Sequence, residues 1–80
     1  MNNKQAGEKL KALIMKRLKE NKRTIAWLAE ALGMNYYTLR GQIKDRPHKL
    51  SVFTLLATEK ALNLPAGDLL FPYFSAPLAA

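Results

Sequence analysis

The chain has 80 residues, of which 49% are apolar and 24% are charged, with 13 Lys and Arg residues against 6 Asp and Glu. A chain of this length forms one domain with a modest core, and its net charge of +7 favours a polyanionic partner, most often nucleic acid. The absence of cysteine excludes disulfides and thiolate metal sites, and it fits the reducing cytoplasm in which we expect the protein. No apolar run approaches the roughly 20 residues that span a bilayer, and no signal peptide is visible.

The first predicted helix runs from Glu8 to Glu20, after a polar segment, residues 1–6, that we expect to be flexible. Its apolar residues recur at the spacing of one helical face, which consists of Leu10, Leu13, Ile14 and Leu18. The opposite face is basic and carries Lys9, Lys11, Lys16, Arg17 and Lys19. We interpret most of these cations as solvated surface, and a membrane-surface helix is disfavoured because the apolar face is needed for the core.

Two shorter helices joined by a tight turn are predicted between Thr24 and Lys44. The first has a single apolar stripe at i, i+3, i+4 and i+7, formed by Ile25, Leu28, Ala29 and Leu32. Thr24 is a suitable N-cap, Gly33 can end this helix in the left-handed conformation, and Asn35 can cap the second helix. Trp27 lies off the stripe, so it either packs at the rim against the first or fourth helix or contacts nucleic acid or a partner subunit.

The second of these helices exposes most of its surface if Leu39 and Ile43 face inward, with successive residues about 100° apart. Six further residues of this helix are then placed on or beside the outward face: Tyr36, Tyr37, Thr38, Arg40, Gly41 and Lys44. Among them, Tyr36 is expected to tilt about halfway back toward the core. Gly41 costs about 1 kcal/mol of helix propensity relative to Ala. Either it lets the backbone approach a partner closely, or a short helix simply tolerates it.

A cationic loop follows, because Pro47 prevents the helix from continuing and Arg46, His48 and Lys49 surround it. This position suits phosphate binding, which fixes a protein on nucleic acid without reading its sequence. Ser51 can cap a fourth helix, whose inward residues are expected to be Val52, Leu55, Leu56 and Leu62.

The C-terminal region is apolar and contains prolines that interrupt it. A last short helical turn is predicted to open at Pro65-Ala66-Gly67-Asp68, with Leu69-Leu70-Phe71 as its apolar side. A domain this small does not easily bury all the apolar side chains of this region by itself. The side chains expected to remain exposed are Leu70, Phe71, Tyr73 and Phe74. Exposed apolar surface usually marks an interface. The alternative is that Phe71 and Phe74 fold back and close the core.

The two central helices carry a recurring pattern, which consists of Leu28-Ala29, Leu32-Gly33-Met34 and Leu39. This pattern resembles the helix-turn-helix of the lambda-repressor/Cro family of DNA-binding, Xre-like regulators, and the resemblance covers roughly residues 8 to 71. It implies an all-α, compact bundle of about five short helices, lambda-repressor-like, with the helix-turn-helix as helices 2 and 3. The DNA-binding domain would span residues 7–71, and an apolar tail, residues 72–80, is assigned to a dimer contact.

In that family the second helix of the motif enters the major groove of DNA, where Arg40 would pair with guanine. The residues assigned to base contacts are Asn35, Tyr36, Tyr37, Arg40, Gly41 and Lys44. Asn35 has two open roles, as a helix cap or as a partner of adenine. The residues assigned to phosphate contacts are Lys22, Arg23, Thr24, Thr38, Arg46, His48, Lys49 and Ser51. The dimer interface is assigned to Leu70, Phe71, Tyr73 and Phe74.

The resemblance implies a sequence-specific double-stranded DNA-binding transcriptional regulator, expected to be a homodimeric repressor that acts by occupying its operator. Two alternatives remain open: the antitoxin of a toxin–antitoxin pair, and a basic helical module that binds RNA or protein. In the RNA-binding alternative, Tyr36 and Tyr37 would stack on unpaired bases. We expect no enzyme, metal site or cofactor, because one histidine, no cysteine and no clustered carboxylates supply no acid–base pair.

Overall fold

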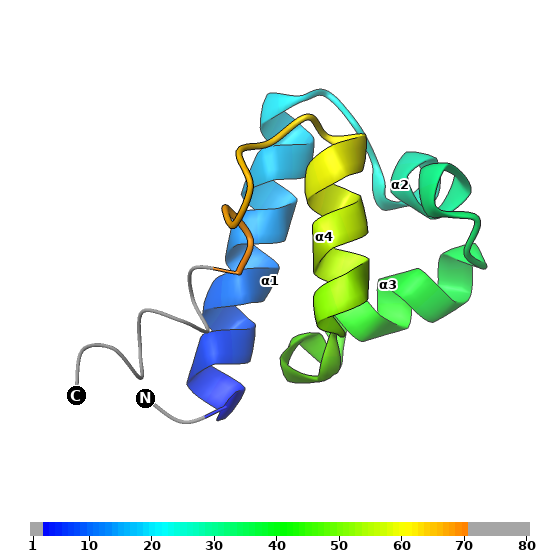
Figure 1. Ribbon diagram of the computed structural model, residues 1–80. Helices are drawn as coiled ribbons and strands as arrows, with labels where there is room; N and C mark the ends of the chain where they lie inside the picture. The colour runs from blue at the N-terminus through cyan, green and yellow to red at the C-terminus, as the bar shows by residue number, and fades with distance from the viewer. Residues whose placement is uncertain (1–2, 71–80) are drawn as a thin grey trace.

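The computed structural model of the protein describes residues 3–70, and helices make up most of this part of the chain (Figure 1). Its elements are α1 (Asn3–Glu20), α2 (Ile25–Leu32), α3 (Tyr36–Lys44), the 3₁₀ helix η1 (Pro47–Lys49) and α4 (Val52–Ala61). The described residues contain no strand, which confirms the all-α class. No helix in this part of the chain is long and apolar enough to cross a membrane.

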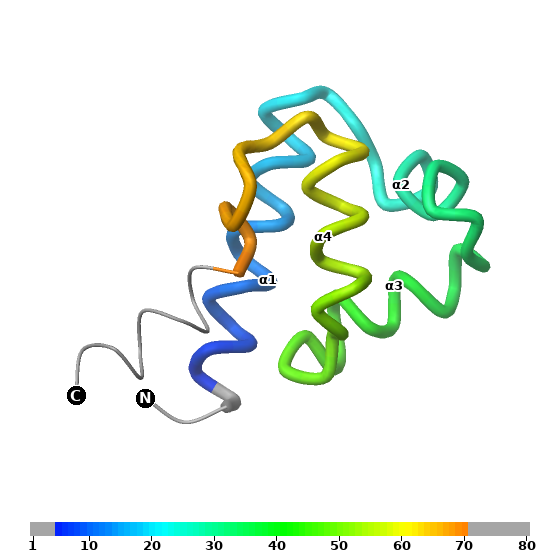
Figure 2. Tube along the Cα trace, viewed as in Figure 1, coloured from blue at the N-terminus to red at the C-terminus, as the bar shows by residue number. Residues whose placement is uncertain are grey.

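The helices meet around a core of branched aliphatic side chains. α2 packs against α3 and α4, whereas α1 packs against α3 and η1. After α4 the chain crosses back toward α1 (Figure 2). The largest fully buried side chains come from all four α-helices and from the last described turn: Leu10, Ile14, Leu18, Leu28, Leu39, Ile43, Leu55 and Leu69. The two from α3 confirm the inward face predicted for that helix.

Three helices begin at a capping side chain, as the sequence predicts. Thr24 Oγ1 accepts a hydrogen bond from the N–H of Trp27 at 3.1 Å, and Ser51 Oγ accepts one from the N–H of Thr54 at 3.0 Å. Asn35 caps α3 in the same way. Each cap satisfies backbone donors that have no partner inside the helix, and such a cap is worth about 1 kcal/mol.

α1, α2 and α4 are each followed by a residue in the left-handed conformation, and these residues are Lys22, Gly33 and Asn63. At the end of α2, Gly33 has a φ of 67°, which glycine adopts without a Cβ clash. The N–H of Met34 donates to Ala29 O at 2.8 Å and satisfies a terminal carbonyl of α2. The predicted tight turn into α3 is therefore confirmed.

α1 begins at Asn3 rather than at Glu8, so residues 3–6 are helical and do not form the flexible segment expected. The start of α1 is covered because η1 packs against it. A Cβ atom at Gly7 would lie 2.7 Å from the backbone nitrogen of His48, closer than real Cβ contacts come. Glycine at position 7 therefore lets these two backbones approach each other.

α4 presents a different row of residues to the core from the row predicted. Val52 and Leu56, expected to face inward, are 53% and 46% exposed, whereas the other two predicted positions are buried. Thr58 and Glu59 complete the inward row instead. The hydroxyl of Thr58 donates to Thr54 O at 2.8 Å, which satisfies it within the helix. An apolar pattern alone does not reveal a buried row that contains two polar residues.

The buried carboxylate of Glu59 holds the segment that follows α4. Its Oε1 accepts a hydrogen bond from the N–H of Gly67 at 3.1 Å, and its Oε2 accepts one from the N–H of Leu69 at 2.8 Å. Residues 66–70 form successive turns, not the short helix predicted there. Gly67 has a φ of 88°, a conformation that favours glycine and that does not continue a helix.

Arg17 ties the same segment to α1. Its Nε and Nη2 donate to the two carboxylate oxygens of Asp68 at 2.8 and 3.2 Å, and its Nη1 donates to Glu20 Oε1 at 2.9 Å. The hydrogen bond to Asp68 is the main reason that the pKa of the Arg17 guanidinium is raised above its usual value. Arg17 is therefore one of the cations on the basic face of α1 that are not solvated surface.

Replacing Glu59 with alanine is expected to lower the free energy of unfolding by about 1–3 kcal/mol, because the amides of Gly67 and Leu69 then lose their acceptor. Urea denaturation followed by circular dichroism measures this loss. Glu30→Ala, at an exposed glutamate of α2, is the matched control and should change stability by less than about 0.5 kcal/mol. Equal effects of the two substitutions would contradict the anchoring role of Glu59.

Candidate nucleic-acid interface

α3 exposes one continuous face, because only two of its side chains are buried. Tyr37 is 78% exposed and Tyr36 is 37% exposed, which confirms that Tyr36 tilts toward the core. The remaining residues of this face are Thr38, Arg40 and Lys44, which are exposed, and Gly41, which is half-buried. The residues assigned to base contacts therefore lie on one side of the molecule, with Asn35 at the start of the helix.

The rings of Tyr36 and Tyr37 pack edge to face, with their centroids 5.0 Å apart and their planes at 71°. Edge-to-face pairs of this kind are favourable because the positive edge of one ring meets the negative face of the other. Tyr36 thus supports Tyr37 from the side nearer the core. The greater part of the Tyr37 side chain remains accessible to a partner.

Asn35 acts as the cap of α3, and this role engages the oxygen that an adenine contact would need. A bidentate pairing with adenine uses the amide oxygen and the amide nitrogen together. The oxygen of Asn35 already accepts hydrogen bonds from the N–H groups of Tyr37 at 2.9 Å and Thr38 at 3.2 Å. Of the two roles considered for Asn35, the structure shows that of helix cap.

Cations continue from the outward face of α3 into η1. We define the α3–η1 cluster as the four exposed residues Arg40, Lys44, Arg46 and Lys49. Asp45 is the one acidic residue within this segment of the sequence. Among the described Lys and Arg side chains, only Arg17 pairs with a carboxylate. The α3–η1 cluster therefore carries positive charge that no ion pair offsets.

Arg46 lies against the C-terminal half of α3. Its N–H donates to Gly41 O at 3.2 Å, and its Nη2 lies 3.6 Å from the position that a Cβ atom would take at Gly41. This is an ordinary van der Waals separation, so Gly41 is not required by close packing. The guanidinium of Arg46 therefore lies beside the half-buried backbone at Gly41.

α1 supports the C-terminal end of α3 in two ways. The Lys11 Nζ donates to Lys44 O at 3.0 Å and supplies a cation where the helix leaves carbonyls without partners. η1 also rests on α1, with Pro47 buried and His48 half-buried over Gly7. The position of His48 is thus set by packing, whereas Lys49 beside it is exposed. Lys11 is a second exception to the solvated surface expected along α1.

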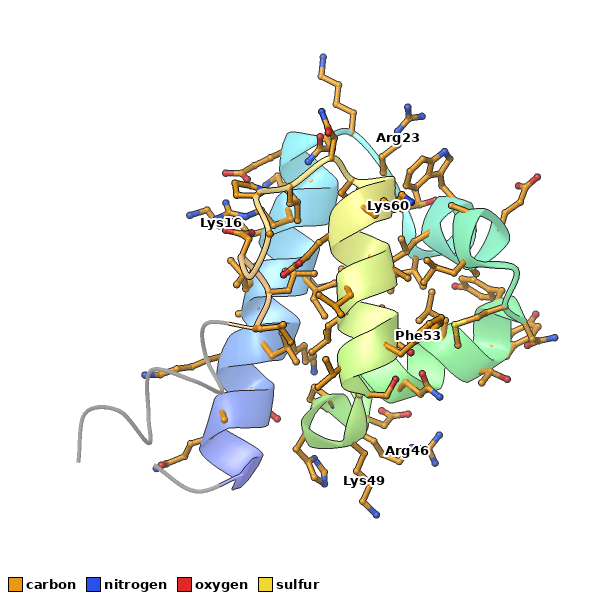
Figure 3. All side chains as sticks on the ribbon, viewed as in Figure 1. Lys16, Arg23, Arg46, Lys49, Phe53 and Lys60 are labelled. Carbon is orange, nitrogen blue, oxygen red and sulfur yellow. The ribbon has the colours of Figure 1, made fainter. Side chains whose placement is uncertain are left out.

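The other residues assigned to phosphate contacts lie elsewhere. Lys22, Arg23 and Thr24 connect α1 to α2 and are exposed. Figure 3 places Arg23 at the opposite end of the molecule from Arg46 and Lys49. The structure therefore separates the assigned phosphate contacts beside the start of α2 from those between the end of α3 and the start of α4, which are Arg46, His48, Lys49 and Ser51. Thr38 belongs to neither group, because it lies in the first turn of α3.

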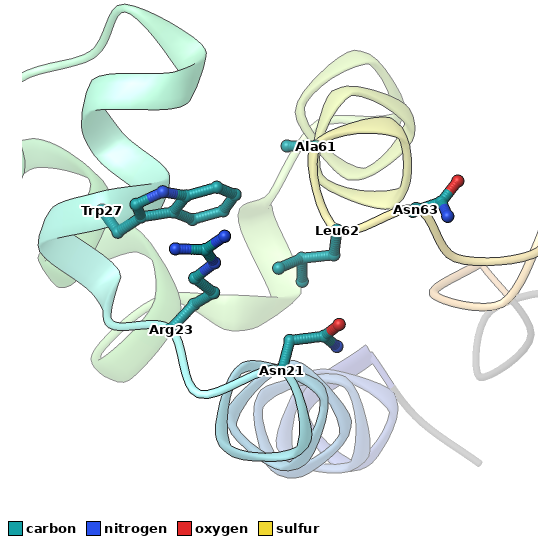
Figure 4. Close-up of a pocket in the computed structure, with 6 residues that line it drawn as sticks. All are labelled: Asn21, Arg23, Trp27, Ala61, Leu62 and Asn63. Atoms are coloured by element: carbon teal, nitrogen blue, oxygen red, sulfur yellow. The ribbon is translucent and has the colours of Figure 1, made fainter.

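Trp27 packs at the rim of the core, which confirms the first of its two interpretations. It is half-buried against the core cluster, and the guanidinium carbon of Arg23 lies 4.5 Å from the centroid of its ring. A shallow pocket of about 190 Å³ opens beside this pair (Figure 4). Its lining residues are Asn21, Arg23, Trp27, Ala61, Leu62 and Asn63.

The expected dimer contact is only in part within the described residues. Leu70 is 8% exposed and belongs to the core, so its side chain is not free surface as expected. The other residues of that assignment, Phe71, Tyr73 and Phe74, lie outside the described residues.

No family model, curated protein or solved structure matches the chain. The functional interpretation of the exposed face of α3 therefore depends on the chemistry and geometry of its own residues.

The two helical glycines are expected to respond to alanine with opposite signs. Gly7→Ala should lower the free energy of unfolding by about 1–3 kcal/mol, because its Cβ would meet the backbone of His48 at under 3 Å. Gly41→Ala should raise it by about 0.5–1 kcal/mol, because alanine has the higher helix propensity and its Cβ meets only Arg46 at 3.6 Å. Thermal unfolding of both variants measures the two effects. A stabilising Gly7→Ala would contradict the close contact between α1 and η1.

Proposed function

We propose that this protein is a sequence-specific, double-stranded DNA-binding transcriptional regulator of the helix-turn-helix type, and that it acts as a dimeric repressor by occupying its operator. The observation that carries this proposal is the exposed face of α3, which is continuous with the uncompensated α3–η1 cluster. The major groove of B-DNA admits an α-helix, and nearby cations contact the phosphates on its edges.

The geometry of α2 and α3 supports the assignment of these helices to the helix-turn-helix motif. The left-handed Gly33 ends α2, and the cap at Asn35 starts α3 after a short turn. Buried Ala29 lies on the inner side of α2, and α2 packs against α3. The resemblance to the lambda-repressor/Cro family remains part of this proposal.

Each residue of the interface has a distinct role in the proposed complex. Arg40 would read guanine by paired hydrogen bonds to O6 and N7, and Tyr37 would present its hydroxyl to a base edge or phosphate. Arg46 and Lys49 would bind the phosphates beside the C-terminal end of α3. Arg23 would contact the backbone at the other end of the domain.

Two substitutions separate base reading from phosphate binding. Arg40→Ala is expected to lose about 1–3 kcal/mol of binding free energy at the specific site while leaving binding to unrelated duplexes almost unchanged. Lys49→Ala should weaken all sequences about equally and reduce the salt dependence of binding by about one ion. Fluorescence anisotropy titrations at several salt concentrations measure both effects. Identical behaviour of the two variants would contradict these roles.

Selection of bound fragments from a random duplex pool tests the function directly. We expect a two-fold symmetric motif whose half-site centres lie about 10 base pairs apart, because two symmetric subunits place their α3 helices one helical turn apart. Arg40→Ala should enrich a weaker or altered motif in the same selection. Recovery of no motif, or tighter binding to single-stranded RNA than to any duplex, would overturn the proposal.

A further inference from the structure

α4 exposes an apolar strip that the proposed DNA interface does not use. We define the α4 strip as Val52, Phe53 and Leu56, whose side chains are 53%, 82% and 46% exposed. Phe53, Leu56 and Lys60 lie within about 60° of one another on the helix, because successive residues are about 100° apart. Figure 3 shows Phe53 and Lys60 on α4. Exposed apolar side chains that cluster on one helix face usually mark an interaction surface.

The chemistry of the α4 strip favours a partner that presents apolar side chains to it. Residues 50–58 contain no charged side chain, although 24% of the whole chain is charged. The next acid, Glu59, is buried and engaged by backbone amides, so Lys60 is the first free charge along α4. The strip itself has no cation that could bind a phosphate backbone or an acidic peptide. A second surface of the same composition matches it better.

The shape of this face is complementary to itself. Phe53 projects from the first turn of α4, and a hollow of about 340 Å³ lies farther along the helix. The residues that line this hollow are Leu56, Glu59, Lys60, Asn63, Leu64 and Ala66. Phe53 and Lys60 are two helical turns apart, about 10 Å along the axis, with Leu56 near the midpoint. When two copies are related by a two-fold axis near Leu56, the Phe53 projection of each copy faces the hollow of the other.

We propose that the α4 strip docks on a second copy of this chain, with the two α4 helices antiparallel and the two-fold axis near Leu56. The Phe53 ring of each copy then enters the hollow of the other copy, beside Lys60. This places the dimer contact on α4, within the described residues, in addition to any contact made by the C-terminal segment. The proposal that this contact assists operator binding rests on the function proposed above.

The size of the strip sets the strength of the contact. A buried aromatic side chain contributes about 150–250 Å², whereas a stable interface buries roughly 1,200–2,000 Å² in total. Each copy also carries a net charge of +7, so two free copies repel each other. The contact is therefore weak in free solution. It becomes effective when two copies bind adjacent half-sites on one duplex, where the local concentration is high and phosphates offset the charge.

Sedimentation of the free protein at high concentration provides the first test. Self-association should strengthen as salt rises, because salt screens the repulsion between the copies and leaves the apolar contact intact. Phe53→Asp should weaken it by about tenfold or more, with an unchanged circular dichroism spectrum. Tyr37→Asp is the matched control, because Tyr37 is an aromatic of similar exposure on α3, 78% against 82%. Equal losses in both variants, or weaker association at higher salt, would overturn the proposal.

Disulfide trapping locates the axis, and the absence of native cysteine makes each introduced thiol unambiguous. Leu56→Cys, near the axis, should form a cross-linked dimer under mild oxidation about tenfold faster than Lys16→Cys on exposed α1. Equal rates would contradict the proposed geometry. Neither this test nor sedimentation uses DNA, so failure of the regulator function leaves both tests valid.

Binding to the selected operator completes the experiment. Phe53→Asp should weaken binding to a duplex with two half-sites by about tenfold or more and leave binding to a single half-site unchanged. Loss on the single half-site as well would show that Phe53 contacts DNA, and it would overturn the assignment of the strip to a second copy.

Discussion

The close contact between η1 and α1 at Gly7 determines where the exposed end of α3 lies. α3 has only two buried side chains, so the core alone does not fix its direction. The turn at Gly33 holds its N-terminal end. The C-terminal end of α3 is held by α1, which supplies both the surface on which η1 rests and the Lys11 ammonium that donates to Lys44 O. The longest helix of the fold therefore supports a helix that is distant from it in sequence.

The same arrangement separates the charges by role. Arg17 and Lys11 bind groups within the fold, whereas the α3–η1 cluster has no carboxylate partner among the described residues. An unpaired surface cation keeps its full attraction for a polyanion and loses little when that polyanion arrives, because no internal bond must be broken. The cations of the α3–η1 cluster thus remain available beside the exposed face of α3.

Local features of the fold could be predicted from sequence, because their causes lie within a few residues. The caps at Thr24, Asn35 and Ser51, the turn at Gly33 and the inward side of α3 follow from spacing and residue type. The contacts of Gly7 and Lys11, and the contact of Arg17 with Asp68, could not be predicted, because the partners are distant in the sequence.

Burial of polar side chains explains the errors along α4 and beyond it. Glu59 faces inward because it binds two backbone amides of a segment that is not helical. A pattern of apolar residues assigns a carboxylate to the surface, and this rotates the predicted face of α4 toward Val52 and Leu56. For the exposed face of α3, the sequence indicates which residues are accessible but contains no partner against which to orient them.

The bareness of the α3 surface has an evolutionary consequence. Thr38, Arg40 and Lys44 are exposed and have no side-chain bond to the rest of the described residues, so replacing them changes stability by less than about 0.5 kcal/mol. Asn35 is different, because its side chain is part of the scaffold. Mutation can therefore alter the chemistry that this face presents while the fold stays intact. Descendants of this chain can thus differ in the side chains of this face through single substitutions, without first gaining stability elsewhere.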